Sequence, residues 1–206
     1  MRVGVIGGGQ LAQMIALAGI PMGIEFSFLL KPEESDRCVS VLGVCVRQDS
    51  SKSYKELFEE MQQPNVITID HESVAAEVLE GFSDYCDIKP GLNAAKILRN
   101  RVTEKDLLSS LDIPTAKYIS FYSYEEFLEK QTSLPYPMVI KAGSGGYDGK
   151  SQYILKNDQD REDLKAAIKP GEHYNEGFIA EVFVDFTREL SFIAVRSTQG
   201  ETKFYT

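Results

Sequence analysis

The sequence predicts an α/β protein, in which a Rossmann-like domain with a parallel sheet precedes an α+β domain. Two observations support this fold class. Short apolar runs alternate with helical patterns up to residue 93, and Gly7–Gly9 join the first run to the first helical pattern. After residue 93, helices and strands mix without this alternation. Because strands that alternate with helices form parallel sheets with right-handed crossovers, we expect one domain at 1–93 and another at 94–206.

The elements of the first domain follow from the spacing of apolar residues. A buried strand is expected at 2–6, and Gly7–Gly9 form the tight turn after it. Apolar residues then recur at helical spacing over 10–18, which predicts a core-facing stripe of Leu11, Met14, Ile15 and Ala18. The other expected elements are strands at 24–30, 41–46 and 65–69 and helices at 53–61 and 74–79.

The second domain begins after the turn signal Lys89-Pro90-Gly91. Ser123 is followed three residues later by Glu126, a capping box that predicts a helix over 124–130. An apolar run at 138–140 predicts a strand that delivers Lys141 at its end. The remaining expected elements are a helix pair or one broken helix at 94–111, a helix at 160–168, and strands at 113–121, 177–184, 187–195 and 203–205.

Composition excludes several classes of function. The net charge of −9 over 206 residues argues against nucleic acid or an anionic membrane surface as a partner. The sequence contains no run of about 18 apolar residues, so we expect no transmembrane helix. Three cysteines without CxxC spacing indicate reduced thiols in a cytoplasmic protein, and two histidines make a histidine-based metal centre unexpected.

The loop after Lys141 carries the strongest chemical signal. Glycines at 143, 145 and 146 precede Tyr147-Asp148-Gly149, which is a hairpin signal because Asp and Gly tolerate positive φ. A lysine on a strand beside a glycine loop offers a point charge and open backbone N–H groups to a polyphosphate. No Walker A pattern is present. The alternative is a solvated hairpin tip with an incidental lysine.

Two further patterns lie at expected strand ends of the first domain. Gly7-x-Gly9-x-x-Ala12 matches a loose dinucleotide-binding fingerprint, but Leu30 is followed by a lysine and a proline where NAD binding needs an acid. The turn either holds an anion at the helix N-terminus or only needs small residues. Asp70-His71-Glu72 either orient an amine or a ribose hydroxyl, or cap the next helix through Glu72 or Ser73.

Several segments together resemble one enzyme family. The segment from Lys141 to Gln152 contains GGYDGKSQ, which is similar to the glycine-rich loop of the N5-carboxyaminoimidazole ribonucleotide synthetases, a family of ATP-grasp ligases. Four other segments resemble the family in the same order, namely 7–14 (GGGQLAQM), 65–74 (NVITIDHESV), 100–105 (NRVTEK) leading to 113–115 (IPT), and 186–191 (FTRELS). The departures are Ala12-Gln13, Asn100 and Ser151, where the family usually has Gly-Arg, Asp and Gly.

The resemblance implies a pre-ATP-grasp domain, an ATP-grasp domain and a specific reaction. ATP phosphorylates bicarbonate to carboxyphosphate, and aminoimidazole ribonucleotide captures the resulting carbon dioxide as a carbamate in purine biosynthesis. Mg²⁺ is implied as a cofactor beside ATP, and a cytoplasmic homodimer as the working form. The alternatives are another ATP-grasp carboxylate–amine ligase and a nucleotide-binding module without catalysis.

The resemblance also assigns roles to residues of this chain. The implied catalytic residues are Lys141, Tyr147 and Asp148. The implied nucleotide-binding residues are Arg101, Lys141, Gly146, Tyr147, Asp148, Gly149, Lys150, Ser151, Gln152, Glu181, Val182, Phe183, Val184 and Glu189. The implied residues for the ribonucleotide are Gly9, Gln10, Leu11 and Glu72. Arg101 and Lys105 are four residues apart on one helical face and would add to the charge of Lys141.

No metal ligand is assigned within the chain. Family members are longer, and their acidic magnesium ligands have no counterpart before Thr206. We therefore expect a fragment that lacks one wall of the ATP cleft and is inactive by itself.

Overall fold

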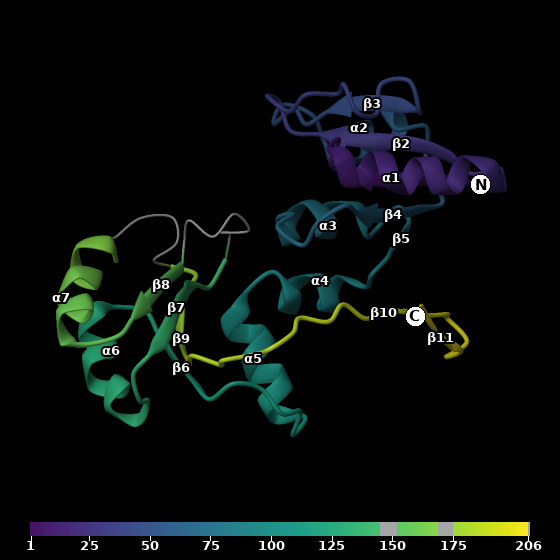
Figure 1. Cartoon of the computed structure of the whole chain (residues 1–206). Helices are drawn as coiled ribbons and strands as arrows, with labels where there is room; N and C mark the ends of the chain where they lie inside the picture. Colours follow the sequence, from purple (N-terminus) through teal and green to yellow (C-terminus); the bar gives the residue numbers. More distant parts are fainter. Residues whose placement is uncertain (145–151, 169–174, 206) are drawn as a thin grey trace.

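The computed structural model describes residues 1–144, 152–168 and 175–205. Figure 1 shows two sheets in separate parts of the molecule, with the helices α4 (Leu92–Leu98) and α5 (Arg101–Ser110) between them. This arrangement agrees with the predicted fold class, and the helix pair expected at 94–111 is present as these two helices.

The first sheet is parallel, as the alternation of strands and helices predicts. Its strand order is β3-β2-β1-β4-β5, and every neighbouring pair is parallel. In the pairing of β1 with β4, Val3 lies opposite Val66 and Ile6 opposite Ile69. The strands are β1 (Arg2–Ile6), β2 (Glu25–Leu30), β3 (Val44–Arg47), β4 (Val66–Ile69) and β5 (Asp87–Ile88).

Helices cover both faces of this sheet. On one face, α1 (Gln10–Gly19), followed by the 3-10 turn η1 (Ile20–Met22), packs Ala12 and Ala16 on Phe26 and Phe28. On the other face, α2 (Tyr54–Glu60) and α3 (Ala76–Phe82) pack Leu57 and Phe82 into a second core. Because all strands of this sheet are parallel, their carboxyl ends lie at one edge, where ligands of such sheets bind.

The predicted buried stripe of α1 is wrong. Leu11, Met14 and Ala18 are exposed, and the buried residues of the helix are Ala12, Ala16 and Gly19, with Ile15 half-buried. The helix lies close to the sheet, so only small side chains fit beneath it: a Cβ on Gly19 would lie 2.6 Å from the ring of Phe26. Close approach, rather than hydrophobicity, selects the buried face.

The second sheet is antiparallel, with strand order β6-β9-β7-β8. One face carries a core in which Phe121, Ile140 and Phe178 pack with Phe127 of α6 and Leu164 of α7. The opposite face is turned toward α5. The elements are β6 (Tyr118–Phe121), α6 (Tyr124–Lys130), the 3-10 turn η2 (Gln131–Ser133), β7 (Met138–Ala142), β8 (Gln152–Leu155), α7 (Asp158–Ala167) and β9 (Phe178–Val182).

The strand expected at 187–195 is wrong over most of its length. Strand β10 covers only Ile193–Arg196 and pairs with β11 (Thr202–Tyr205), and residues 183–192 form no strand. Every residue of both strands is exposed. An extended segment needs a neighbouring strand for its backbone hydrogen bonds, and β10 has one only where β11 returns.

Two findings concern chemistry and environment. The three cysteines are free and half-buried. Over the described part of the chain, no helix combines the length and apolar character needed to cross a bilayer.

The turn between β1 and α1 generates a stability prediction. Gly7 has φ of +126°, and a Cβ there would lie 2.2 Å from the carboxylate Oδ1 of Asp70. We expect Gly7→Ala to lower the free energy of unfolding by more than about 2 kcal/mol, because backbone strain and overpacking add.

Gly23→Ala is the matched control for this prediction. Gly23 also has positive φ (+77°), but nothing lies within 4 Å of an added Cβ, so its cost is expected to be about 1 kcal/mol. Urea denaturation of both variants measures the difference. Equal losses would show that Asp70 does not restrict the turn.

Candidate functional site

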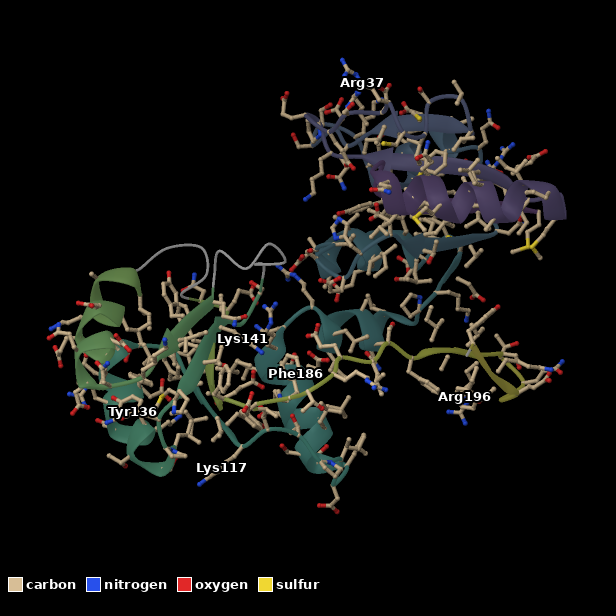
Figure 2. All side chains as sticks on the ribbon, viewed as in Figure 1. Arg37, Lys117, Tyr136, Lys141, Phe186 and Arg196 are labelled. Atoms are coloured by element: carbon tan, nitrogen blue, oxygen red, sulfur yellow. The ribbon has the colours of Figure 1, made fainter. Side chains whose placement is uncertain are left out.

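The face of the second sheet that is turned toward α5 carries a lysine and a glutamate on neighbouring strands. Side chains alternate between the faces of a strand, and Met138, Ile140 and Ala142 of β7 enter the core. Lys141 therefore points to the opposite face, as does Glu181 of β9, which pairs in register with Val139. In Figure 2, Lys141 lies toward the middle of the molecule, between the second sheet and α5.

A single carboxylate links these strands to α5. Lys141 Nζ lies 2.6 Å from Oε2 of Glu181, and Lys105 Nζ lies 2.6 Å from Oε1. Lys105 also donates a hydrogen bond to Thr115 Oγ1 and lies 5.7 Å from the ring centroid of Tyr118. We call Lys105, Glu181 and Lys141 the charge triad.

Burial and charge act in opposite directions on Glu181, whose side chain is only 7% exposed. Burial raises the pKa of the carboxyl, but ion pairs with Lys105 and Lys141 outweigh it and hold the pKa below its usual value. A lowered native pKa contributes stability above the unfolded-state pKa. That contribution is lost as pH falls through the native value.

The N-terminus of α5 is fastened to the end of β7. The backbone N–H of Arg101 donates to Gly143 O at 2.7 Å, and Arg101 Nη1 donates to Ala142 O at 2.9 Å. Asn100 caps the helix through Val102 N and also donates to the carbonyl of Glu176. The structure therefore brings together Arg101, Lys105 and Lys141, as the sequence predicts.

The segment that follows the triad is extended and partly exposed. Backbone N–H groups of Val182 and Phe183 donate to Lys117 O and Pro137 O at 2.9 and 3.0 Å. Phe183 and Val184 are 40% and 53% exposed. Phe183 and Val184 thus lie at the surface directly beyond the triad.

The remaining predicted nucleotide-binding residues lie on β8, at the surface, or outside the described part of the chain. Gln152 lies opposite Lys141 in the pairing of β7 with β8, as the hairpin prediction requires. Glu189 is exposed and forms no hydrogen bond or ion pair within the described residues. Six predicted residues lie outside the described part of the chain, namely Gly146, Tyr147, Asp148, Gly149, Lys150 and Ser151.

A second polar cluster lies at the carboxyl end of β4. The Asp70 side chain is only 4% exposed, and its Oδ1 lies 3.5 Å from His71 Nε2. Burial raises the pKa of Asp70, Glu34 raises it further, and His71 opposes both. Helix α3 begins at Ala76 without a side-chain cap, so the alternative role of Glu72 or Ser73 as a cap is wrong.

The glycine turn already holds a carboxylate of the chain itself. Glu34 Oε1 accepts a hydrogen bond from Gly8 N at 2.7 Å, and Oε2 accepts one from Lys31 N at 3.0 Å. Gly9 is the N-cap of α1, and Gln10 and Leu11 are exposed in its first turn. One N–H of the predicted anion site is therefore occupied by Glu34.

A cavity lies between Glu72 and the start of α5. It has a volume of about 310 Å³ and is lined by Glu72 together with Leu98, Arg99, Arg101 and Glu104. The Oε1 atom of Glu72 is buried and accepts no hydrogen bond within the described residues. Glu72, which the resemblance assigns to the ribonucleotide, and Arg101, which it assigns to the nucleotide, thus line the same cavity.

Two family models match adjoining parts of this chain. The model of the ribonucleotide synthetase preATP-grasp domain matches residues 1–99, and the model of the ATP-grasp domain matches residues 106–206. Residues 106–206 thus form an ATP-grasp domain, and residues 1–99 a preATP-grasp domain. These matches and the two observed sheets confirm the predicted fold class.

Several relatives that carry the same name match this chain over its whole length. The N5-carboxyaminoimidazole ribonucleotide synthase of Pseudomonas aeruginosa is 35% identical, with 100% of this chain and 55% of the relative covered. That of Aquifex aeolicus is 33% identical, with 100% and 52% covered. A Staphylococcus aureus N5-carboxyaminoimidazole synthetase structure complexed with ADP has a TM-score of 0.86 at 28% identity, covering 99% of this chain and 53% of that one. The chain spans about half the length of the curated relatives it matches.

Acidic side chains in the described part of the chain are not gathered into a metal-binding cluster. No group of three histidine, cysteine or acidic side chains in residues 1–144, 152–168 and 175–205 is arranged to hold a metal ion. The acid of the charge triad is already engaged by two lysines.

Two contacts of the site were not predicted from the sequence. Lys105 was expected only to add to the charge of Lys141, yet it binds Glu181 directly. Its spacing from Arg101 was visible, but its partner comes from a strand far along the chain. Glu34 lies beyond the position where NAD binding needs an acid and was assigned no role, although its carboxylate accepts a hydrogen bond from Gly8 N.

The buried Asp70 carboxylate generates a pH prediction. A raised native pKa means that the folded chain binds more protons than the unfolded chain, so stability falls as pH rises from the unfolded value of about 3.9 through the native value. We expect Asp70→Asn to raise the free energy of unfolding at pH 7 by about 1 kcal/mol, because a desolvated acceptor loses its charge. The gain should vanish near pH 3, where wild-type Asp70 is also neutral.

Asp84→Asn is the control, because Asp84 is exposed in the same domain. Denaturant titrations at both pH values provide the comparison. A loss of stability in Asp70→Asn at pH 7 would mean that the ionised carboxylate stabilises the turn.

Proposed function

We propose that the chain forms the nucleotide-binding part of an enzyme that uses ATP and bicarbonate to carboxylate aminoimidazole ribonucleotide in purine biosynthesis. The observation that carries the proposal is the convergence of Lys105, Glu181 and Lys141 with Arg101 at the end of β7. Lys141 and Glu181 lie within the part of the chain that the ATP-grasp model matches, and Arg101 and Lys105 lie just before it. The names of the relatives support the reaction. Relatives solved with ADP support the nucleotide.

In this proposal the chain's residues act by position and charge. A bicarbonate oxygen attacks the γ-phosphorus of ATP, the bond to the β-phosphate oxygen breaks, and ADP leaves. Lys141 and Arg101 lie at the end of β7 and offset the negative charge of the phosphates, which is the main task in phosphoryl transfer. Lys141 stands on β7, which is paired with a strand on each side, so little freedom is lost when it meets a phosphate.

The second half of the reaction needs the ribonucleotide close by. Carboxyphosphate releases phosphate and carbon dioxide, and the amine of the ribonucleotide attacks the carbon and loses a proton. Within the described residues, the buried Oε1 of Glu72 accepts no hydrogen bond. Glu72 lines the same cavity as Arg101. We assign Glu72 to the amine or to a ribose hydroxyl, and Gly9, Gln10 and Leu11 to the same ligand.

The nucleotide base and ribose fall to the segment after the triad. The surface position of Phe183 and Val184 supports contact with the adenine edge, and the exposed Glu189 is available to ribose hydroxyls. The domain boundary at residues 93 and 94, Mg²⁺, bicarbonate, the cytoplasm and a homodimer belong to the same proposal. These five points rest on the resemblance and on the names of the relatives.

The proposal predicts the effect of removing Lys141. We expect Lys141→Ala to weaken ATP binding by this chain roughly tenfold or more, because a charge-assisted hydrogen bond to phosphate is lost. Lys117→Ala is the matched control. Lys117 is exposed, and its Nζ donates a hydrogen bond to Ser133 O. Figure 2 shows Lys117 at the lower edge of the molecule, away from Lys141.

Isothermal titration of both variants with ATP measures the two affinities. Equal affinity of Lys141→Ala and Lys117→Ala would contradict the assignment of the phosphate site to Lys141. Absence of ATP binding by the wild-type chain would contradict the proposed function for these residues.

A further inference from the structure

The charge triad contains one more lysine than Glu181 needs. A buried carboxylate is satisfied by one close cation with further hydrogen bonds, yet Glu181 has a lysine at 2.6 Å on each oxygen. If all three groups are ionised, the triad carries a net charge of +1. This excess charge lies on the sheet face that α5 covers, not in the core.

The two lysines differ in how they are held. Lys105 has a side chain that is 15% exposed, and Glu181, Thr115 and the ring of Tyr118 surround its ammonium group. Lys141 has a side chain that is 34% exposed. Lys105 is therefore the fixed member of the triad, and Lys141 is the member that can turn to a ligand.

Removal of Lys105 would change the charge seen by a ligand. Glu181 would then have Lys141 as its only lysine, and the pair would be neutral. The full charge of the Glu181 carboxylate would then attract Lys141. This attraction competes with the attraction of Lys141 to a phosphate. In the wild-type chain, Lys105 takes one of the two carboxylate oxygens and weakens that competition.

We propose that Lys105 is a positioning residue: it holds Glu181 against α5 and thereby leaves the charge of Lys141 to a phosphate of the bound nucleotide. This inference rests on the proposed function. It goes further by assigning a role to a residue that touches no ligand and acts through Glu181.

The experiment compares ADP with adenosine, which has the same base and ribose but no phosphate. Isothermal titration of the 206-residue chain is made with both probes. Lys105→Met should weaken ADP binding about tenfold and leave adenosine binding unchanged. Lys105→Arg should keep ADP binding within about twofold, because the guanidinium can still pair with Glu181.

The double variant Lys105→Met with Glu181→Gln tests whether the effect passes through Glu181. Without the carboxylate, Lys141 has no competing anion, so the double variant should bind ADP more tightly than Lys105→Met alone. Thermal unfolding of each variant identifies any that fail to fold. If Lys105→Met does not fold, Lys105→Gln serves instead, because its amide can still bond Thr115 while the positive charge beside Glu181 is lost, and it should also weaken ADP binding about tenfold.

The outcomes separate the inference from the function on which it rests. If the wild-type chain binds ADP and Lys105→Met binds it equally well, the inference is wrong and the proposed function stands. Equal losses for ADP and adenosine would show that Lys105 only supports the fold. A double variant that binds ADP no more tightly than Lys105→Met alone would also overturn the inference. A wild-type chain that binds neither probe would contradict the proposed function itself, and the inference with it.

Discussion

The site in this chain depends on one buried carboxylate held between two ammonium groups. Isolated, the Glu181 carboxylate would be costly on a covered sheet face. With a lysine at each oxygen it stays ionised, and it joins β7, β9 and α5 at a single point. Arg101, which begins α5, reaches the end of β7 independently through Ala142 and Gly143. The helix is therefore fixed at both its first and second turns.

This constraint explains why the two faces of the second sheet have different tasks. The apolar face buries Met138, Ile140 and Phe178 under α6 and α7 and supplies the stability of the domain. The polar face carries Lys141 and Glu181, and it is held to α5 by charge instead of apolar packing. A site on strands whose far side is firmly packed loses little freedom when a ligand binds.

Much of the fold could be predicted from the sequence, because its signals are local. The alternation of strands and helices predicted the parallel first sheet, and Ser123 marked the start of α6. Errors arose where a distant surface decides the outcome. The buried face of α1 is set by how closely the helix approaches Phe26, and the strand expected at 187–195 lacks a neighbour over 187–192.

The site shows the same division. Lys141 at a strand end and Arg101 on a helical face were visible in the sequence, and the structure brings them together. The role of Lys105 was not visible, because its partner depends on the register of β9 against β6 and β7. Glu34 was missed for a similar reason: the loop after β2 folds back onto the first turn.

The central claim is that Glu181 remains ionised between its two lysines, and a direct titration of that carboxyl tests it. The ¹³Cδ chemical shift of Glu181 in glutamate-labelled chain can be followed by NMR from pH 7 downward, with the signal assigned by its loss in Glu181→Gln. The account predicts a midpoint below the ordinary glutamate pKa of about 4.3, or no titration before the chain unfolds in acid. A midpoint at or above the ordinary value would contradict it, because the lysines would then not outweigh the cost of burial.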